Sequence, residues 1–347
     1  MRAREVSGRT SAQVILAMAF LAVTCGELLS GGIRATPFSL LGVFLVPPYV
    51  VVALTYGIGV LLVREASVRW DRGWGGTLLL AAANAWVLQG IFTKVLFGPA
   101  SSPDIQQLGS YGHWLGVNWV LVAVALYLDG FLATVVPIFL TNELFPGARG
   151  RRLLSDLGVG IALAVFGPLL AWEDIYINAN NNVGPSLAHP FVSALSPLQL
   201  TVWAIVVVGL CAAAWKVPPT LLRPRTERPV GSSWVMVALG VVATVGTLLV
   251  EGLGWRVVPW PELLLGADVL GYAALLQVVR GRVGRSGNLT HRAALVAGSL
   301  APWLVYDVFL EVGGDYLVLP IAGAVFAALA VLWRKGRRAA PVPIAGA

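Results

Sequence analysis

Long apolar segments, separated by short basic ones, recur along nearly the whole chain of 347 residues. A helix needs roughly 20 apolar residues to cross the ~30 Å hydrocarbon core of a bilayer, and most of these segments reach that length. Apolar residues make up 57% of the chain and charged residues only 12%, so a soluble domain of this size would lack polar surface. The pattern predicts an all-α fold, a polytopic transmembrane helix bundle that forms one integral membrane domain over residues 1–347.

We expect about ten spanning helices. Nine stays possible, because the third and eighth segments are less purely apolar than the others. Whether the two halves form an inverted repeat, as in many transporters, is left open by the sequence. The predicted spans lie near residues 12–29, 38–63, 76–98, 114–140, 153–172, 198–217, 232–252, 260–279, 292–312 and 316–333.

The basic residues test this count independently, because Lys and Arg concentrate in cytoplasmic loops. With the N-terminus inside, all 24 Lys and Arg except Arg34, Arg256 and Lys94 fall on the cytoplasmic side. A wrong helix count would scramble that alternation. We therefore predict a multi-pass protein of the plasma membrane with both termini in the cytoplasm. The net charge of +7 lies in these loops, so we expect anionic lipid headgroups as their partner, and no nucleic acid.

The sequence contains no motif for a cofactor or for the active site of a soluble enzyme. The two cysteines, Cys25 and Cys211, each lie inside an apolar segment, and the three histidines lack the spacing of a zinc site. No nucleotide-binding loop or hydrolase motif is present. We expect no cofactor and no bound metal, and the sequence does not identify a protein partner.

Ionisable residues inside predicted spans carry the functional prediction, because each is costly in hydrocarbon. Five of them lie at the midplane or in the outer half of the membrane under this topology. Such a set, drawn from several helices at similar depth, is compatible with a polar cavity that opens outward and holds a small-molecule substrate. The candidate binding residues are Glu27, Lys94, Asp129, Asp268 and Asp307.

Simpler explanations compete with this cavity. Lys94 is four residues from Gly98 and can extend to the outer interface, and Glu27 is near a helix end. Asp129 and Asp268 have no such route to water and are the stronger candidates. Asp307 shares a helix face with Glu311, four residues later, and the two acids could bind a cation or share a proton.

Three segments, at residues 56–65, 89–97 and 115–120, resemble a family of uncharacterised prokaryotic polytopic membrane proteins. That family is in turn similar to the CAAX-protease-like (CPBP) intramembrane metalloproteases. The resemblance covers roughly residues 20–150. It implies paired glutamates in the third helix and a histidine in the fourth, which together bind a metal and activate water.

This chain departs from the implied site. The two glutamate positions are occupied by Leu88 and Gln89, and the histidine position by Leu128. Leucine has no ligand atom, and a glutamine amide is a poor base. If the resemblance holds, the protease site has been lost here.

Three functions remain. The first is a carrier for a small solute, ion or lipid that uses the outward-opening polar cavity. The second is a non-catalytic membrane scaffold or subunit, a degenerate relative of an intramembrane protease. The third is an intramembrane enzyme acting on lipid or peptide. The carrier is the leading hypothesis, the scaffold is second, and the enzyme is the least favoured of the three.

Overall fold

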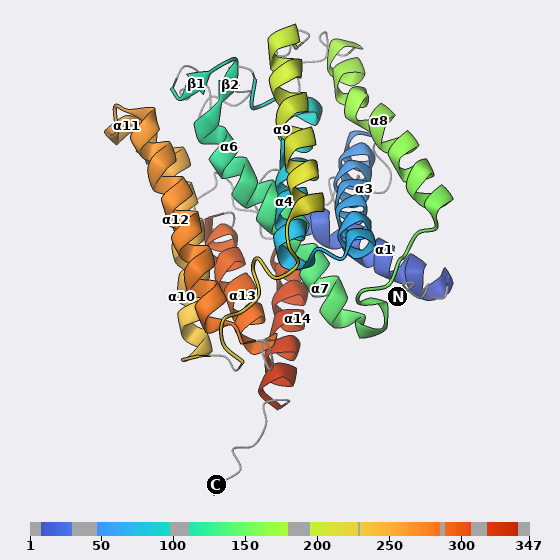
Figure 1. The fold of residues 1–347 in the computed structure, drawn as a ribbon, viewed down its shortest axis with the longest axis vertical. Helices are drawn as coiled ribbons and strands as arrows, with labels where there is room; N and C mark the ends of the chain where they lie inside the picture. The colour runs from blue at the N-terminus through green and yellow to red at the C-terminus, as the bar shows by residue number, and fades with distance from the viewer. Residues whose placement is uncertain are drawn as a thin grey trace, which may run out of the picture.

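The computed structural model describes residues 8–29, 47–97, 111–179, 195–227, 230–284, 289–306 and 318–338. Within these ranges the chain is a bundle of helices with one short antiparallel hairpin, β1 (His113–Trp114) and β2 (Val117–Asn118) (Figure 1). The predicted helical class is confirmed.

The first half of the chain supplies the centre of the bundle. Several of its helices change pitch along their length, from α-helix to the wider π-helix. Its helices are α1 (Gly8–Val23) continued by η1 (Thr24–Leu28), α3 (Pro47–Trp70), α4 (Gly73–Val87) continued by η2 (Leu88–Phe92), and α6 (Trp119–Ala125) continued by η3 (Leu126–Val135) and α7 (Val136–Leu144), with a short 3₁₀ turn, η4 (Pro146–Ala148).

The second half packs against the first, and residues of both halves form one buried apolar cluster. Ser196 caps α9 by accepting a hydrogen bond from the backbone N–H of Gln199, whose side chain bonds back to the Ser196 N–H. The helices are α8 (Asp156–Ala179), α9 (Pro197–Lys216), α10 (Ser233–Leu249) continued by η5 (Val250–Gly254) and α11 (Trp255–Val257), α12 (Pro261–Arg282), α13 (Leu289–Val305) and α14 (Val318–Arg338).

Seven helices in the described ranges are long and apolar enough to cross a membrane, and two shorter apolar helices accompany them. The seven lie at Thr10–Leu28, Val50–Trp70, Gly73–Phe92, Trp119–Leu144, Pro197–Lys216, Pro261–Arg282 and Val318–Arg338. The shorter two are Asp156–Trp172 and Ser233–Leu249. Each predicted span overlaps a described helix, whereas the count of ten spans and the sidedness of the termini stay predictions.

The helix at the second predicted span, 38–63, extends past the end of that span. The helix there, α3, continues to Trp70 and so carries Arg64 and Glu65 within it rather than in a loop. Both side chains are buried and bonded to neighbouring segments, which is why the helix continues through them. The fifth helix likewise extends beyond the predicted 153–172, to Ala179.

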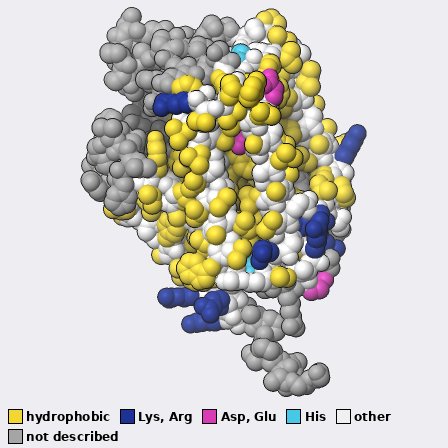
Figure 2. All heavy atoms as spheres, turned by 90° about the vertical axis from the view of Figure 1, so that its left-hand side faces the viewer, with side chains coloured by type: hydrophobic (Ala, Val, Ile, Leu, Met, Phe, Trp, Pro, Cys, Tyr) yellow, Lys and Arg dark blue, Asp and Glu magenta, His cyan; other side chains and the backbone are white. Residues whose placement is uncertain are grey.

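Burial divides the bundle into centre and periphery. In the 18-residue apolar stretch of Trp119–Leu144, 78% of the residues are buried. In the corresponding stretches of α9 and α12, only 6% are buried. The exposed residues of the outer helices are large and apolar, such as Leu163, Ile205 and Leu270. Figure 2 shows this apolar surface over one side of the molecule, with a group of Lys and Arg side chains at its lower end and others near its upper and right margins. Such a surface is stable against lipid tails.

Two glycines bring α10 and α13 into contact. A Cβ added at Gly240 would overlap the backbone of Leu295 and Ser299, and one at Gly298 would overlap the carbonyl group of Val237. Small residues allow this backbone approach between membrane helices, where packing replaces the hydrophobic effect.

Candidate functional site

Asp129 lies in η3, at the centre of the bundle, and only 3% of it is exposed. Its Oδ1 accepts a hydrogen bond of 2.9 Å from the Tyr56 hydroxyl of α3, and its Oδ2 accepts one of 2.8 Å from Gln89 Nε2 of η2. Both carboxylate oxygens are therefore held by neutral donors that come from two other helices.

Further polar groups extend this cluster. The Thr93 hydroxyl donates to Gln89 Oε1 at 2.8 Å, and the Thr134 hydroxyl donates to the backbone carbonyl of Asp129 at 2.7 Å. Asn84 Nδ2 donates to Thr134 Oγ1 at 3.0 Å. We call these residues the Asp129 network: Tyr56, Asn84, Gln89, Thr93, Asp129 and Thr134.

The network lies on and beside η3, which contacts η1 and is bonded to η2 through Asp129 and Gln89. η1 and η2 each close with an i→i+5 hydrogen bond, from Leu29 N–H to the Thr24 carbonyl at 2.8 Å and from Thr93 N–H to the Leu88 carbonyl at 2.9 Å. η3 carries Asp129 itself and contacts both η1 and α4. π-helical turns are rare and occur frequently at functional sites, so three around one carboxylate mark this position.

Glu27, in η1, approaches the same cluster. Its partly buried carboxylate interacts with the Tyr56 hydroxyl. The neighbouring Gly26 makes room for this approach, because a Cβ there would lie 2.5 Å from Ala133 Cβ and 3.0 Å from the Tyr56 ring. Two of the predicted acids, Glu27 and Asp129, therefore converge on one hydroxyl.

Of the other predicted site residues, Lys94 and Asp268 lie within the described ranges. Asp268, on α12, is partly buried, and its Oδ2 is enclosed without a hydrogen-bond donor among the described residues. Lys94, just after η2, is buried with φ of +56° and interacts with other groups. Asp307 and Glu311 lie outside the described residues. That all five predicted residues line one cavity stays a prediction.

The positions implied by the family resemblance lie beside Asp129. Leu88 is fully buried in the apolar core, and Leu128 packs against a neighbouring apolar cluster. Gln89, by contrast, contacts Asp129 directly. In the described part of the chain no three His, Cys, Asp or Glu side chains are grouped to hold a metal ion. The chemistry available at this place is hydrogen bonding and the binding of a proton or small cation by a carboxylate.

Sequence reasoning missed a second polar cluster, at the C-terminal end of α3. Arg64 and Glu65 are each only 1% exposed and pair at 3.1 Å. Arg64 also donates to the carbonyls of Ala148, at 2.7 Å, and Arg151, at 3.1 Å. Glu65 accepts a hydrogen bond from the Leu153 N–H at 2.8 Å. We call this the Arg64–Glu65 clamp, because it joins α3 to the segment between α7 and α8.

Its signal in the sequence is an adjacent Arg-Glu pair at the end of an apolar segment. A positive charge at that position is equally compatible with a cytoplasmic loop. Only the structure distinguishes such a loop from a buried ion pair within the helix.

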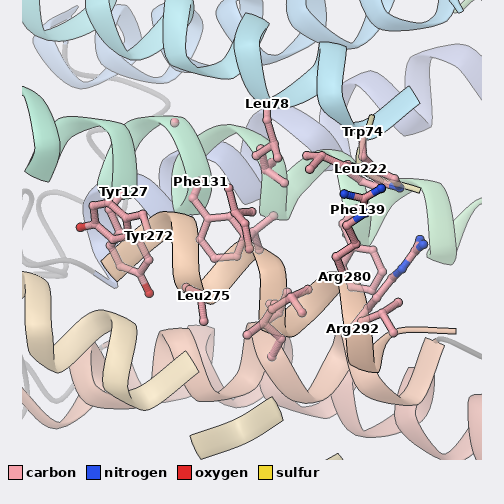
Figure 3. Close-up of a pocket in the computed structure, with 18 of the residues that line it drawn as sticks. Trp74, Leu78, Tyr127, Phe131, Phe139, Leu222, Tyr272, Leu275, Arg280 and Arg292 are labelled. Carbon is pink, nitrogen blue, oxygen red and sulfur yellow. The ribbon is translucent and has the colours of Figure 1, made fainter. Parts of the chain in front are cut away.

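A pocket of about 360 Å³ lies on another face of η3, between α4, α7, α12 and α13 (Figure 3). Tyr127, Gly130 and Phe131 of η3 line it, while the intervening Asp129 bonds to Tyr56 and Gln89. The same helical segment therefore separates a polar network from an apolar pocket.

No protein-family model matches this chain, and no curated protein or solved structure matches it.

Proposed function

We propose that this chain is a multi-pass carrier of the plasma membrane for a small solute, ion or lipid. In this proposal ten helices span the membrane, both termini are cytoplasmic, and the Asp129 network is the element that binds a proton or small cation. One observation carries the proposal: among the described residues, the buried carboxylate of Asp129 is held by neutral donors alone, on a π-helical segment that contacts two others.

A carboxylate inside a membrane is costly unless its charge is used or neutralised. The donors to Asp129 in the described residues, Tyr56 and Gln89, orient the carboxylate without cancelling its charge. It can therefore take up and release a proton or a small cation, which is what a coupled carrier requires. The convergence of Glu27 on Tyr56 supplies a second acid within the same cluster. Lys94, Asp268 and Asp307 complete the proposed outward-opening cavity.

A scaffold is the second candidate, and one observation favours it. Both oxygens of Asp129 already have protein partners, as a carboxylate that only organises the bundle would have. The two candidates differ in what neutralising Asp129 removes. A carrier loses transport, whereas a scaffold loses only stability.

The test is a gradient screen in proteoliposomes. The wild-type chain and Asp129→Asn are reconstituted at equal density, and currents are recorded on a solid-supported membrane under imposed gradients of H⁺, Na⁺, K⁺ and small organic anions. We expect at least one gradient to drive a current in the wild type and none in Asp129→Asn.

Asp71→Asn is the matched control. Asp71 lies in the turn after α3, is exposed, and has φ of +50°, a conformation that asparagine tolerates well. It should carry the wild-type current. Retained current in Asp129→Asn would reject the role of Asp129, and silence of the wild type under every gradient would favour the scaffold.

A further inference from the structure

The pocket beside η3 has apolar walls along most of its length. α4 contributes Leu78 and Ala82, η3 contributes Phe131, and α12 contributes Leu275. Its volume, about 360 Å³, falls within the range of roughly 300–1,000 Å³ typical of ligand pockets. Walls of this kind exclude a strongly hydrated solute and accept a hydrocarbon chain.

The two ends of the pocket differ in chemistry, as Figure 3 shows. At one end the rings of Tyr127 and Tyr272 stack with centroids 5.8 Å apart. At the other end lie Arg280 and Arg292 beside Trp74. The Arg292 guanidinium lies over the Trp74 ring, 5.6 Å from its centroid. The pocket is thus amphipathic along its length, with its positive charge at one end.

Both arginines keep nitrogen atoms available to a ligand. Arg280 donates from Nε to the carbonyl of Arg223 at 3.0 Å, which leaves its terminal nitrogens. Among the described residues neither Arg280 nor Arg292 forms an ion pair. The acid that acts on Arg292 electrostatically, Glu143, is itself paired with Arg149. Among the described residues, the two arginines at this end of the pocket therefore have too few acidic partners to neutralise both of their charges.

The charged end of the pocket lies toward the basic end of the bundle, where α12 and α14 finish (Figure 1). The segment after α9 closes over it: Leu222 and Pro224 line the pocket, and the Arg225 N–H bonds to the Arg280 carbonyl at 3.1 Å. Under the proposed topology this is the cytoplasmic end, where anionic lipid headgroups are concentrated.

We propose that the pocket binds one anionic phospholipid, with an acyl chain between α4, η3 and α12 and the phosphate at Arg280 and Arg292. Guanidinium groups suit phosphate because their planar donors match its oxygens. The hydrocarbon wall then selects a lipid over free phosphate. This site is independent of the Asp129 network and would be occupied in a carrier or in a scaffold.

Native mass spectrometry of the purified full chain in a neutral detergent tests the proposal. The probes are dioleoyl phosphatidylglycerol, dioleoyl phosphatidylcholine and inorganic phosphate. The wild type should retain one phosphatidylglycerol in preference to phosphatidylcholine, and millimolar phosphate should not displace it. The double variant Arg280→Gln/Arg292→Gln should bind phosphatidylglycerol about tenfold more weakly or worse, since two cations are removed.

Arg334→Gln/Lys335→Gln is the charge-matched control, because both residues are exposed and lie at the same end of the bundle. It should retain the lipid as the wild type does, whereas an equal loss would mean that binding is general surface attraction.

A second pair of variants keeps the test valid if the arginine variant folds poorly. Leu275→Trp fills the pocket and should release the lipid, whereas Leu270→Trp, on the exposed face of the same helix, should not. Retention of the lipid by Leu275→Trp, or its displacement by phosphate alone, would overturn the proposal.

Discussion

The C-terminal end of α3 and the middle of η3 each bury a carboxylate, yet their surroundings differ. Glu65 lies beside Arg64 and 3.5 Å from the Arg69 guanidinium, and it accepts a backbone N–H as well. Asp129 is held by a phenol and an amide. In the clamp, therefore, the buried carboxylate is paired with a positive charge. In the Asp129 network, the described partners orient the carboxylate but carry no charge to compensate it.

We propose that the two clusters have different roles. A buried ion pair that also bonds to the backbone of another segment, as Arg64 and Glu65 do, holds that segment in place, and removing one partner is strongly destabilising. A buried carboxylate with neutral partners stays able to exchange a proton or cation, and such groups in membranes are commonly functional. We expect removal of a charge from the clamp to act mainly on stability, and removal of the Asp129 charge to act mainly on transport.

The largest stability effect should come from Arg64→Gln. It removes the ion pair with Glu65 and the bonds to the carbonyls of Ala148 and Arg151, and we expect a loss of about 3–5 kcal/mol. Unfolding can be followed by labelling of the buried Cys25 with a thiol-reactive dye during heating, in a Cys211→Ser background.

Arg334→Gln, at an exposed position, is the control for charge removal and should unfold like the parent. An unfolding midpoint for Arg64→Gln equal to that of the control would mean that the clamp does not hold α3 to the α7–α8 segment.

Tyr56→Phe should have the next largest effect. It removes one hydrogen bond to a carboxylate and leaves the ring that packs on Gly26, so we expect a loss of about 1.5–3 kcal/mol. Tyr111→Phe removes a bond to a neutral acceptor, the Val258 carbonyl, and should cost about 0.5–1.5 kcal/mol. If the two variants unfold alike, Asp129 does not act as a charged acceptor.

Asp129→Asn should cost only about 1 kcal/mol of stability. Asparagine keeps one oxygen for either Tyr56 or Gln89, while its amide faces the other donor. The same dye-labelling assay measures this loss. A loss as large as that of Arg64→Gln would place Asp129 with the clamp as a structural group.

Asp268→Asn should have the smallest effect, below about 0.5 kcal/mol or slightly stabilising. Its enclosed Oδ2 has no donor among the described residues, so no hydrogen bond is lost there and an uncompensated charge is removed. A marked loss of stability would show that α12 uses this carboxylate structurally. A loss of transport current without loss of stability would support its place in the proposed cavity.

The positions of the helices were predictable from the sequence, because each span depends on a local run of apolar residues. The ends of the helices were less predictable. Arg64 and Glu65 continue α3 because they meet Ala148, Arg151 and Leu153, which lie more than 80 residues later. The periodicity of apolar residues along the chain does not predict partners so distant in the sequence.

The candidate site was predictable in part. Asp129 stands out as an ionisable residue in the middle of an apolar segment. Its partners do not, because Tyr56 and Gln89 lie 73 and 40 residues away and have ordinary uncharged side chains. The π-helical turns depend on packing between helices rather than on local propensity. The apolar pocket likewise forms only when α4, η3, α12 and α13 come together.

The central claim is that Asp129 exchanges a charged species across the membrane. The most direct measurement records, on one reconstituted preparation of Asp129→Asn, both the gradient-driven current and the unfolding midpoint. Our account predicts that the current is abolished while the midpoint stays within the small shift of a lost hydrogen bond. A current equal to that of the wild type, or a current that falls only in proportion to the folded fraction, would contradict it.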